Sequence, residues 1–370
     1  MSRKILVVLI ILLISLGSLR LDNSIGSHPK LPDQNNVRVI LTEPIIIRCN
    51  ENFTDYGFSG EGTKEEPYII ENYTLQGYNE TDECAIQIEN TTKHFIIKNC
   101  HISNCYYGLK IKVENCSVIL EDNIITEGYF GITSSVKNCA FKIENCQVAK
   151  CVTGMEINTT LSNNEKILVQ KNWIGNCSFI GMKLIGKGIQ ATNNTIVNVV
   201  GWAVLLQMTD QYLAYNNISD NNVGIYGENI DNSIITKNNF KNNSHHGIYF
   251  DRFCDNNIIF HNNFIENYPE AISQARDSAY ETKSNVWYNE TLKEGNYWSD
   301  WNGISAYRIS GEAEKWDHYP LNQTWPMKIT PKTTNVILKG MIITLPMMIL
   351  GVIIRKKREK KEGRGRKGKR

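Results

Sequence analysis

Four charged side chains stand at matching distances behind a repeated small residue. Glu228 and Asp251 each follow a glycine by four residues, while Arg252 and Arg276 each follow a small residue by five. If these segments stack in space, the two carboxylates lie ~5 Å apart beside two guanidinium groups. Such a group can bind hydroxyls or provide acid–base catalysis on a sugar. The alternative is that all four are solvated charges in turns.

The segment 286–325 is rich in aromatic residues. It contains five of the seven tryptophans, at positions 287, 298, 301, 316 and 325. Aromatic side chains can stack on sugar rings, or they can bury enough area to close the open end of a fold. Trp298, Trp301 and Trp316 are therefore candidate ligand-binding residues, with capping as the alternative use.

No other group of residues predicts an active site. The chain has no Ser/His/Asp order, no Cys/His signature and no zinc-ligand spacing. Among the seven histidines only His245 and His246 are adjacent, and no Met-rich segment accompanies them. The sequence predicts neither a metal site nor a cofactor.

The elements that must position these residues repeat along the chain. A small residue followed by an apolar one recurs at intervals of 20 to 27 residues, most often 23, at Ala85, Gly108, Gly131, Gly154, Gly181, Gly201, Gly224, Gly247 and Ala271. Short alternating segments separated by Asn, Asp and Gly lie between these marks, which indicates brief strands joined by tight turns. This period fits one coil of a parallel β-helix.

A second column of residues, mostly Asn, precedes the marks by seven to nine positions. An Asn at the same turn of successive coils can point inward and pass amide hydrogen bonds along the stack. We expect this structural ladder to comprise Asn123, Asn172, Asn194, Asn217, Asn239 and Asn263.

The ten cysteines share the phase of the repeat. Cys116 and Cys139 lie 23 residues apart, and Cys151 and Cys177 each follow the second column by five. Neighbouring coils place Cα atoms ~4.8 Å apart, which is within disulfide range. We predict the bridges Cys116–Cys139 and Cys151–Cys177, with free stacked thiols as the alternative.

Two terminal segments of the repeat region resemble a known family. GNYWSDWNG at 295–303, YRISG from Tyr307 and DHYPL at 317–321 are similar to the ending of NosD-like right-handed parallel β-helix proteins, and GEGTKEEPYIIENY resembles the entry segment of archaeal-type relatives. The resemblance covers about residues 37–321. It implies an exported protein with carbohydrate binding or sugar-chain processing, and the family's name carries a copper-delivery role.

The chain departs from that family where relatives carry an Asp-rich loop. Only Asn-Gly-Ile-Ser-Ala follows the Trp of the motif. Asp300 and Asp317 alone do not supply the converging oxygen ligands that a hard cation needs.

The predicted fold class is all-β, a right-handed parallel β-helix of about nine coils with caps at both ends and a C-terminal transmembrane helix. We expect an N-terminal cap at 37–84, coils at 85–285 and an aromatic cap at 286–325. Residues 1–18 have the layout of a signal peptide or uncleaved anchor, and 19–36 form a linker. A second linker at 326–335 leads to an apolar span at 336–354.

The final segment, 355–370, carries eleven basic and two acidic residues. The positive-inside rule places it in the cytoplasm and the coils outside a single-pass membrane protein. Nucleic-acid binding is the alternative use of this tail, but the remaining chain is net acidic, so we expect no nucleic-acid partner.

Three function classes remain open. The first is a membrane-anchored surface protein that binds carbohydrate or a surface-layer component. The second is an extracellular polysaccharide lyase, hydrolase or epimerase, and the third is a structural coat or adhesion rod. Twelve Asn-x-Ser/Thr sequons permit glycosylation if the chain is exported.

Overall fold

The computed structural model describes residues 38–160, 165–268, 273–280 and 285–326. The predicted signal peptide, the first linker, the transmembrane span and the basic tail lie outside these residues. Within them, no helix has both the length and the apolar composition needed to cross a membrane.

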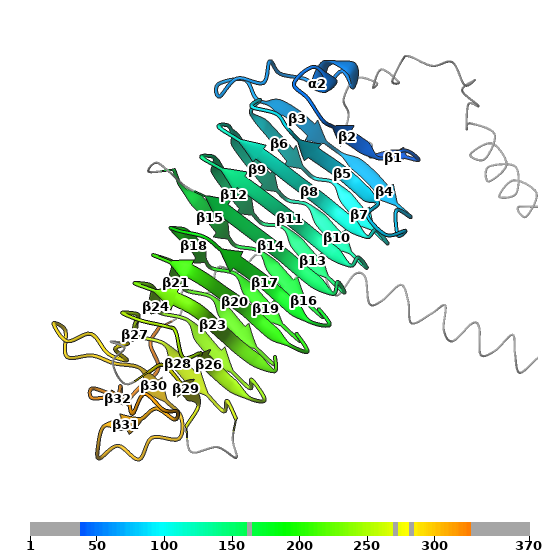
Figure 1. Ribbon diagram of the computed structural model, residues 1–370. Coiled ribbons are helices and arrows are strands. Elements are labelled where there is room, and N and C mark those ends of the chain that lie inside the picture. The colour runs from blue at the N-terminus through cyan, green and yellow to red at the C-terminus, as the bar shows by residue number, and fades with distance from the viewer. Residues whose placement is uncertain (1–37, 161–164, 269–272, 281–284, 327–370) are drawn as a thin grey trace, which may run out of the picture.

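The chain winds into a parallel β-solenoid of about nine turns (Figure 1). Each turn adds one strand to each of three sheets, which we call A, B and C. A turn runs from sheet C to sheet A and then to sheet B, and strands of successive turns pair in parallel register. The expectation of stacked short strands is confirmed.

The strands of the described residues are short. Sheet A contains β1 (Val39–Leu41), β4 (Tyr73–Gln76), β7 (His101–Ser103), β10 (Ile124–Thr126), β13 (Gln147–Ala149), β16 (Trp173–Gly175), β19 (Thr195–Val197), β22 (Asn217–Ser219), β25 (Asn239–Lys241), β28 (Asn263–Ile265) and β30 (Tyr297–Trp298). Sheet B contains β2 (Ile45–Ile47), β5 (Cys84–Glu89), β8 (Tyr107–Glu114), β11 (Phe130–Lys137), β14 (Thr153–Thr160), β17 (Ile180–Ile185), β20 (Trp202–Thr209), β23 (Val223–Asp231), β26 (His246–Phe250) and β29 (Ala275–Asp277). Sheet C contains β3 (Tyr68–Glu71), β6 (Phe95–Lys98), β9 (Ser117–Glu121), β12 (Ala140–Glu144), β15 (Ile167–Gln170), β18 (Ile189–Thr192), β21 (Tyr212–Ala214), β24 (Ile234–Thr236) and β27 (Ile258–Phe260).

The ends of the solenoid carry small additional elements. The helix α2 (Asn52–Asp55) lies at the N-terminal end, where Phe53 is buried against Tyr68 with ring centroids 4.6 Å apart. An antiparallel pair, β31 (Tyr307–Arg308) and β32 (Trp316–Asp317), lies at the C-terminal end (Figure 1).

The small-residue marks exist because successive coils approach closely there. A Cβ atom on Gly131 would lie 2.5 Å from the carbonyl oxygen of Gly154 and 2.5 Å from a methyl group of Val148. Strand register shows that two marks were misplaced. Ala203, not Gly201, continues the column, and Gln274, not Ala271, ends it.

Each corner between two sheets follows one rule. A residue with left-handed backbone comes first, as at Asn99 (φ 51°) and Asn193 (φ 56°), and the next residue points into the core. Asn and Asp tolerate this conformation better than other non-glycine residues. The rule explains why the chain is rich in Asn at fixed spacing.

The predicted ladder lies at the corner between sheets C and A. Asn172 Nδ2 donates to Asn194 Oδ1 over 3.0 Å, and the same contact repeats one coil later. Asn123 is also buried there and accepts from the Cys100 backbone. The placement of Asn123, Asn172 and Asn194 is confirmed.

The ladder is continued by Asn216, Asn238 and Asn262, so the prediction of Asn217, Asn239 and Asn263 is wrong by one position. In the three pairs that begin at Asn216, Asn238 and Asn262, the first Asn turns inward and the second begins a sheet A strand. Since side chains alternate along a strand, a shift of one residue moves the second Asn to the outer face.

Two further ladders occupy the other corners. Asn221, Asn243 and Asn267 link the corner between sheets A and B, and Ser233, Asn257 and Asn285 link the corner between B and C. In the N-terminal coils, cysteines hold the equivalent inward positions, namely Cys100, Cys105, Cys116, Cys139, Cys146, Cys151 and Cys177. The shared phase of the cysteines therefore reflects corner packing.

All ten cysteines are free thiols, so the structure contains neither predicted bridge. The Sγ atoms of Cys116 and Cys139 lie 3.6 Å apart, far longer than the ~2.05 Å of a disulfide bond. Cys151 and Cys177 are likewise buried and unbonded on adjacent coils.

Candidate functional site

The two candidate carboxylates occupy different settings. Glu228 lies on β23 in register with Gln207, whose Nε2 donates to Glu228 Oε2 over 2.6 Å. Asp251 closes the turn after β26, because its Oδ1 accepts from the backbone N–H groups of Asn229 (3.2 Å) and Phe253 (3.0 Å). Each carboxylate therefore has partners of its own.

The two candidate arginines are not stacked on each other. Arg276 is in register with Tyr249, lies 5.5 Å from that ring and pairs with Glu312 over 2.9 Å. Arg252 is exposed beside Phe253. The predicted quartet fails because the last coil's mark is Gln274, which shifts the register of Arg276 by three residues.

A row of aromatic side chains follows the outer surface of sheet B. We call it the aromatic row; it comprises Tyr106, Tyr107, Tyr129, Phe130, Phe179, Trp202, Tyr226 and Tyr249. All are partly or fully exposed, with Tyr129 at 46% and Phe179 at 50%. The row thus presents apolar rings to solvent from β8, β11, β20, β23 and β26 and from the corners before β8, β11 and β17.

Rings of neighbouring coils contact one another within two groups, one from Tyr106 to Phe130 and one from Phe179 to Tyr249, and Thr153 on β14 lies between them. Trp202 stacks on Tyr226 with centroids 4.7 Å apart and planes at 11°, while Tyr226 meets Tyr249 edge to face at 5.4 Å and 88°. Burial raises the pKa of the Tyr226 phenol, and the charges of Asp251 and Glu228 raise it further. The two predicted carboxylates therefore lie near this end of the row.

Few charges interrupt the aromatic row. The Lys110 ammonium lies 4.3 Å from the centre of the Tyr107 ring, and Lys183 pairs with Glu156 over 3.4 Å. Sequence reasoning missed the row because its members stand at different offsets from the marks. Tyr107 and Phe130 stand one residue before a mark, whereas Tyr226 and Tyr249 stand two residues after one. Comparing both positions across all the coils would have revealed these four aromatic residues.

Trp298, a candidate ligand-binding residue, is buried at the C-terminal end of the solenoid. Its side chain is 2% exposed and lies between the rings of Phe264 and Tyr307, with both centroids 4.1 Å away. The indole Nε1 donates to Asp317 Oδ2 over 2.9 Å. Trp298 ends the inner stack of sheet A, so the capping alternative holds for it.

The other two candidate tryptophans differ from each other. Trp301 packs partly buried against the core, and its Nε1 donates to the Ser305 carbonyl over 2.6 Å. Trp316 is 41% exposed on β32, with the Arg308 guanidinium 6.0 Å from its ring centre. Of the three, only Trp316 offers a largely open ring, and it lies away from the aromatic row's contacts.

The buried carboxylate of Asp317 completes the C-terminal end. Besides Trp298, it accepts from the Asn296 backbone N–H over 2.7 Å. Burial raises the pKa of Asp317 to about 6. A Cβ on Gly295 would lie 1.9 Å from Asp317 Oδ1, so the glycine leaves the space that this carboxylate fills. The motif is therefore a structural cap.

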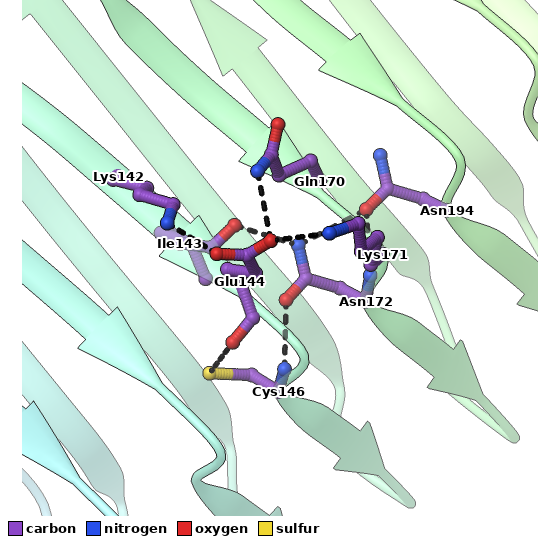
Figure 2. A network of polar contacts seen from close by, with 8 residues as sticks. All are labelled: Lys142, Ile143, Glu144, Cys146, Gln170, Lys171, Asn172 and Asn194. Atoms are coloured by element: carbon purple, nitrogen blue, oxygen red, sulfur yellow. Dashed lines mark hydrogen bonds and ion pairs between the residues drawn. The ribbon is translucent and has the colours of Figure 1, made fainter. Parts of the chain in front are cut away.

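Figure 2 shows a network of polar contacts on sheet C around Glu144. This carboxylate pairs with Lys142 and with Lys171 (2.8 Å), and Gln170 Nε2 donates to it over 2.9 Å. Burial opposes ionisation, yet these contacts together lower the pKa of Glu144 to about 2. The ladder residue Asn172 lies beside it. With its oxygens satisfied by neighbouring coils, Glu144 joins coils rather than forming an open site.

Residues 140–303 match the family model described as "Periplasmic copper-binding protein (NosD)". The chain therefore carries a NosD family domain over those residues, which extend from β12 into the cap. Within the described ranges, no group of three or more His, Cys, Asp or Glu side chains is placed to hold a metal ion.

Three solved structures resemble the chain. The A-module of the Azotobacter vinelandii mannuronan C-5 epimerase AlgE4 is 12% identical, with a TM-score of 0.37, covering 54% of this chain and 73% of that one. The Dettilon tailspike protein is 10% identical (TM-score 0.35, 70% and 62% covered), and tailspike protein 3 of bacteriophage CBA120 is 7% identical (0.23, 76% and 58%). No curated protein matches in sequence. Similarity at this level carries no information on function.

Proposed function

We propose that this chain, with its NosD family domain, is a cell-surface protein whose solenoid binds carbohydrate. The aromatic row is the observation that carries the proposal. Exposed rings held at coil spacing give an apolar yet hydrogen-bonding surface, because six of the eight are tyrosines or tryptophan. Such a surface suits the apolar faces and hydroxyl edges of sugars.

The surface location rests on the terminal segments outside the described residues. The leader-like segment 1–18, the apolar span 336–354 and the basic tail support a single-pass protein with the solenoid outside. The expected partner is a glycan or a surface-layer component.

Binding is favoured over catalysis by the state of the candidate acids. Glu228 is held by Gln207, and Asp251 accepts backbone hydrogen bonds in its turn. A glycosidase needs two carboxyl groups facing one bond, one of them able to donate a proton. Glu228 and Asp251 directly follow the paired residues Gly227 and Phe250 on adjacent coils, but Glu228 Oε2 and Asp251 Oδ1 already accept hydrogen bonds from the protein.

The test is a glycan array probed with the full chain in detergent, followed by a reducing-end assay on every glycan retained. We expect binding without release of reducing ends. The double variant Trp202→Ala/Tyr226→Ala should lose at least tenfold in affinity, while the exposed control Trp316→Ala should bind as the parent. Absence of any retained glycan, or full affinity of the double variant for every retained glycan, would refute the proposal.

A further inference from the structure

The outer face of sheet A carries a second, uncharged set of side chains in one column. Strand register aligns Gln147, Trp173, Thr195, Asn217 and Asn239 on successive coils from β13 to β25. We call this set the sheet A column. All five are partly exposed, and none is charged.

Trp173 lies flat on the sheet. Three neighbouring atoms of its six-membered ring lie 2.5, 2.7 and 3.1 Å from where a Cβ of Gly175 would be, so the ring covers that glycine. The adjacent positions on neighbouring strands are Ala149 and Val197, which are also short. The opposite face of the indole is therefore turned away from the sheet, and no other aromatic ring of the described residues stacks on it.

The amides of the column have hydrogen-bonding capacity to spare. Asn239 Nδ2 donates to Asn217 Oδ1 over 2.9 Å. Within the described part of the chain, that contact leaves Asn217 Nδ2 as a donor and Asn239 Oδ1 as an acceptor without a protein partner. These atoms follow the indole along the rod, beyond Thr195.

The next residue of the same alignment shows what such an amide takes. Asn263 Nδ2 donates to the Trp325 carbonyl over 3.0 Å, and the Trp325 N–H donates to Asn263 Oδ1 over 2.6 Å. The protein's own C-terminal segment thus supplies one donor and one acceptor to Asn263. Asn239 and Asn217 lie one and two coils earlier in the same alignment. Their free Oδ1 and Nδ2 atoms can form an equivalent pair of hydrogen bonds with a bound molecule.

We propose that the sheet A column binds a linear, neutral glycan along the axis of the rod. One sugar ring lies on the free face of Trp173, and hydroxyl groups of the following sugars pair with Thr195, Asn217 and Asn239. The absence of charge in the column favours a neutral chain over a polyuronate. This inference rests on the proposed carbohydrate-binding function but assigns it a separate face.

The test uses the full chain with cellohexaose and chitohexaose as neutral probes and polygalacturonate as the acidic one, measured by calorimetry. Trp173→Ala should weaken neutral hexaose binding at least tenfold. Gly175→Val keeps the indole but displaces it from the sheet, and it should have a similar effect. Phe253→Ala truncates an exposed ring outside both the sheet A column and the aromatic row, so it is the matched control and should retain this binding. Trp202→Ala is measured alongside it to tell the two faces apart.

Several outcomes would overturn the inference. They are unchanged hexaose affinity in a folded Trp173→Ala or Gly175→Val variant, binding of polygalacturonate alone, or displacement of the hexaoses by an extended Thr/Val decapeptide that binds more tightly. Loss in Trp202→Ala with full binding in Trp173→Ala would reject the sheet A column while leaving the aromatic row in place. If glycans retained on the array keep full affinity in both Trp173→Ala and the Trp202→Ala/Tyr226→Ala double variant, they bind elsewhere, and the aromatic row is rejected as well.

Discussion

Substituting Asn238 by Ala tests the corner rule most directly. Its side chain is fully buried, and its Oδ1 accepts from both the backbone N–H and the Nδ2 of Asn216, each over 2.9 Å. Its Nδ2 donates to the carbonyl of Leu213 over 2.9 Å. Truncation leaves the Asn216 backbone N–H and one of its two Nδ2 hydrogens without an acceptor, while the other Nδ2 hydrogen keeps the Ala191 carbonyl. At about 1–3 kcal/mol for each unsatisfied group, the free energy of unfolding should fall by about 2–6 kcal/mol.

The matched control is one residue away. Asn239 lies on the outer face and makes one half-exposed hydrogen bond to Asn217, so Asn239→Ala should cost less than about 1 kcal/mol. Urea unfolding followed by far-ultraviolet circular dichroism measures both. Because coils can unfold locally, hydrogen exchange of the Asn216 amide gives a second reading, and only Asn238→Ala should accelerate it. Equal losses of stability in the two variants would show that the assignment of inward and outward residues is wrong.

Three further predictions concern the C-terminal cap. Burial raises the pKa of Asp317 from 3.8 to about 6, so its contribution to stability is fully present below about pH 4 and is lost as pH rises through 6. The free energy of unfolding should therefore drop by up to about 3 kcal/mol across that pH window. The Asp317→Asn variant should lack this part of the pH dependence in urea titrations. Gly295→Ala should destabilise by several kcal/mol, on the order of an overpacked core, because its Cβ meets the Asp317 carboxylate, whereas Gly303→Ala has open space and should cost about 1 kcal/mol for its left-handed backbone, as thermal melts would show. Trp298→Ala should cost about 3–5 kcal/mol and Trp316→Ala under about 1 kcal/mol in the same melts, and similar values for both would contradict their difference in burial.

The architecture was predictable because the same physical constraint recurs in every coil. Gly131 and its equivalents must be small where coils touch, and that requirement is visible as a period in the sequence. The position of a single residue within the coil was less predictable. Asn216 and Asn217 have identical chemistry, and only the left-handed residue before the pair, Tyr215 (φ 60°), decides which of them turns inward.

The candidate site was harder to predict because it depends on register across insertions. The segment between β28 and β29 moves the last mark from Ala271 to Gln274, and this shift separated Arg276 from Arg252. The aromatic row and the sheet A column required no unusual motif. They arise from ordinary residues such as Trp173 and Tyr226, whose role appears only once coils are stacked and outer faces are assigned.

The C-terminal cap gives the most distinctive part of the sequence a structural role. The Oδ1 of each ladder Asn accepts hydrogen bonds from the backbone N–H and Nδ2 of the ladder residue one coil earlier. The N–H groups of the last member of each ladder therefore need an acceptor that no further coil can supply. Asn296 finds it in Asp317, Asn285 donates to Asp277 over 3.3 Å, and Asn267 donates to Gln274 over 2.9 Å. Three ladders thus require three buried polar groups at one end, together with the tryptophans that shield them. The terminal motif therefore satisfies the hydrogen bonds of the last coil, and the repeated outer faces are where we propose that a ligand binds.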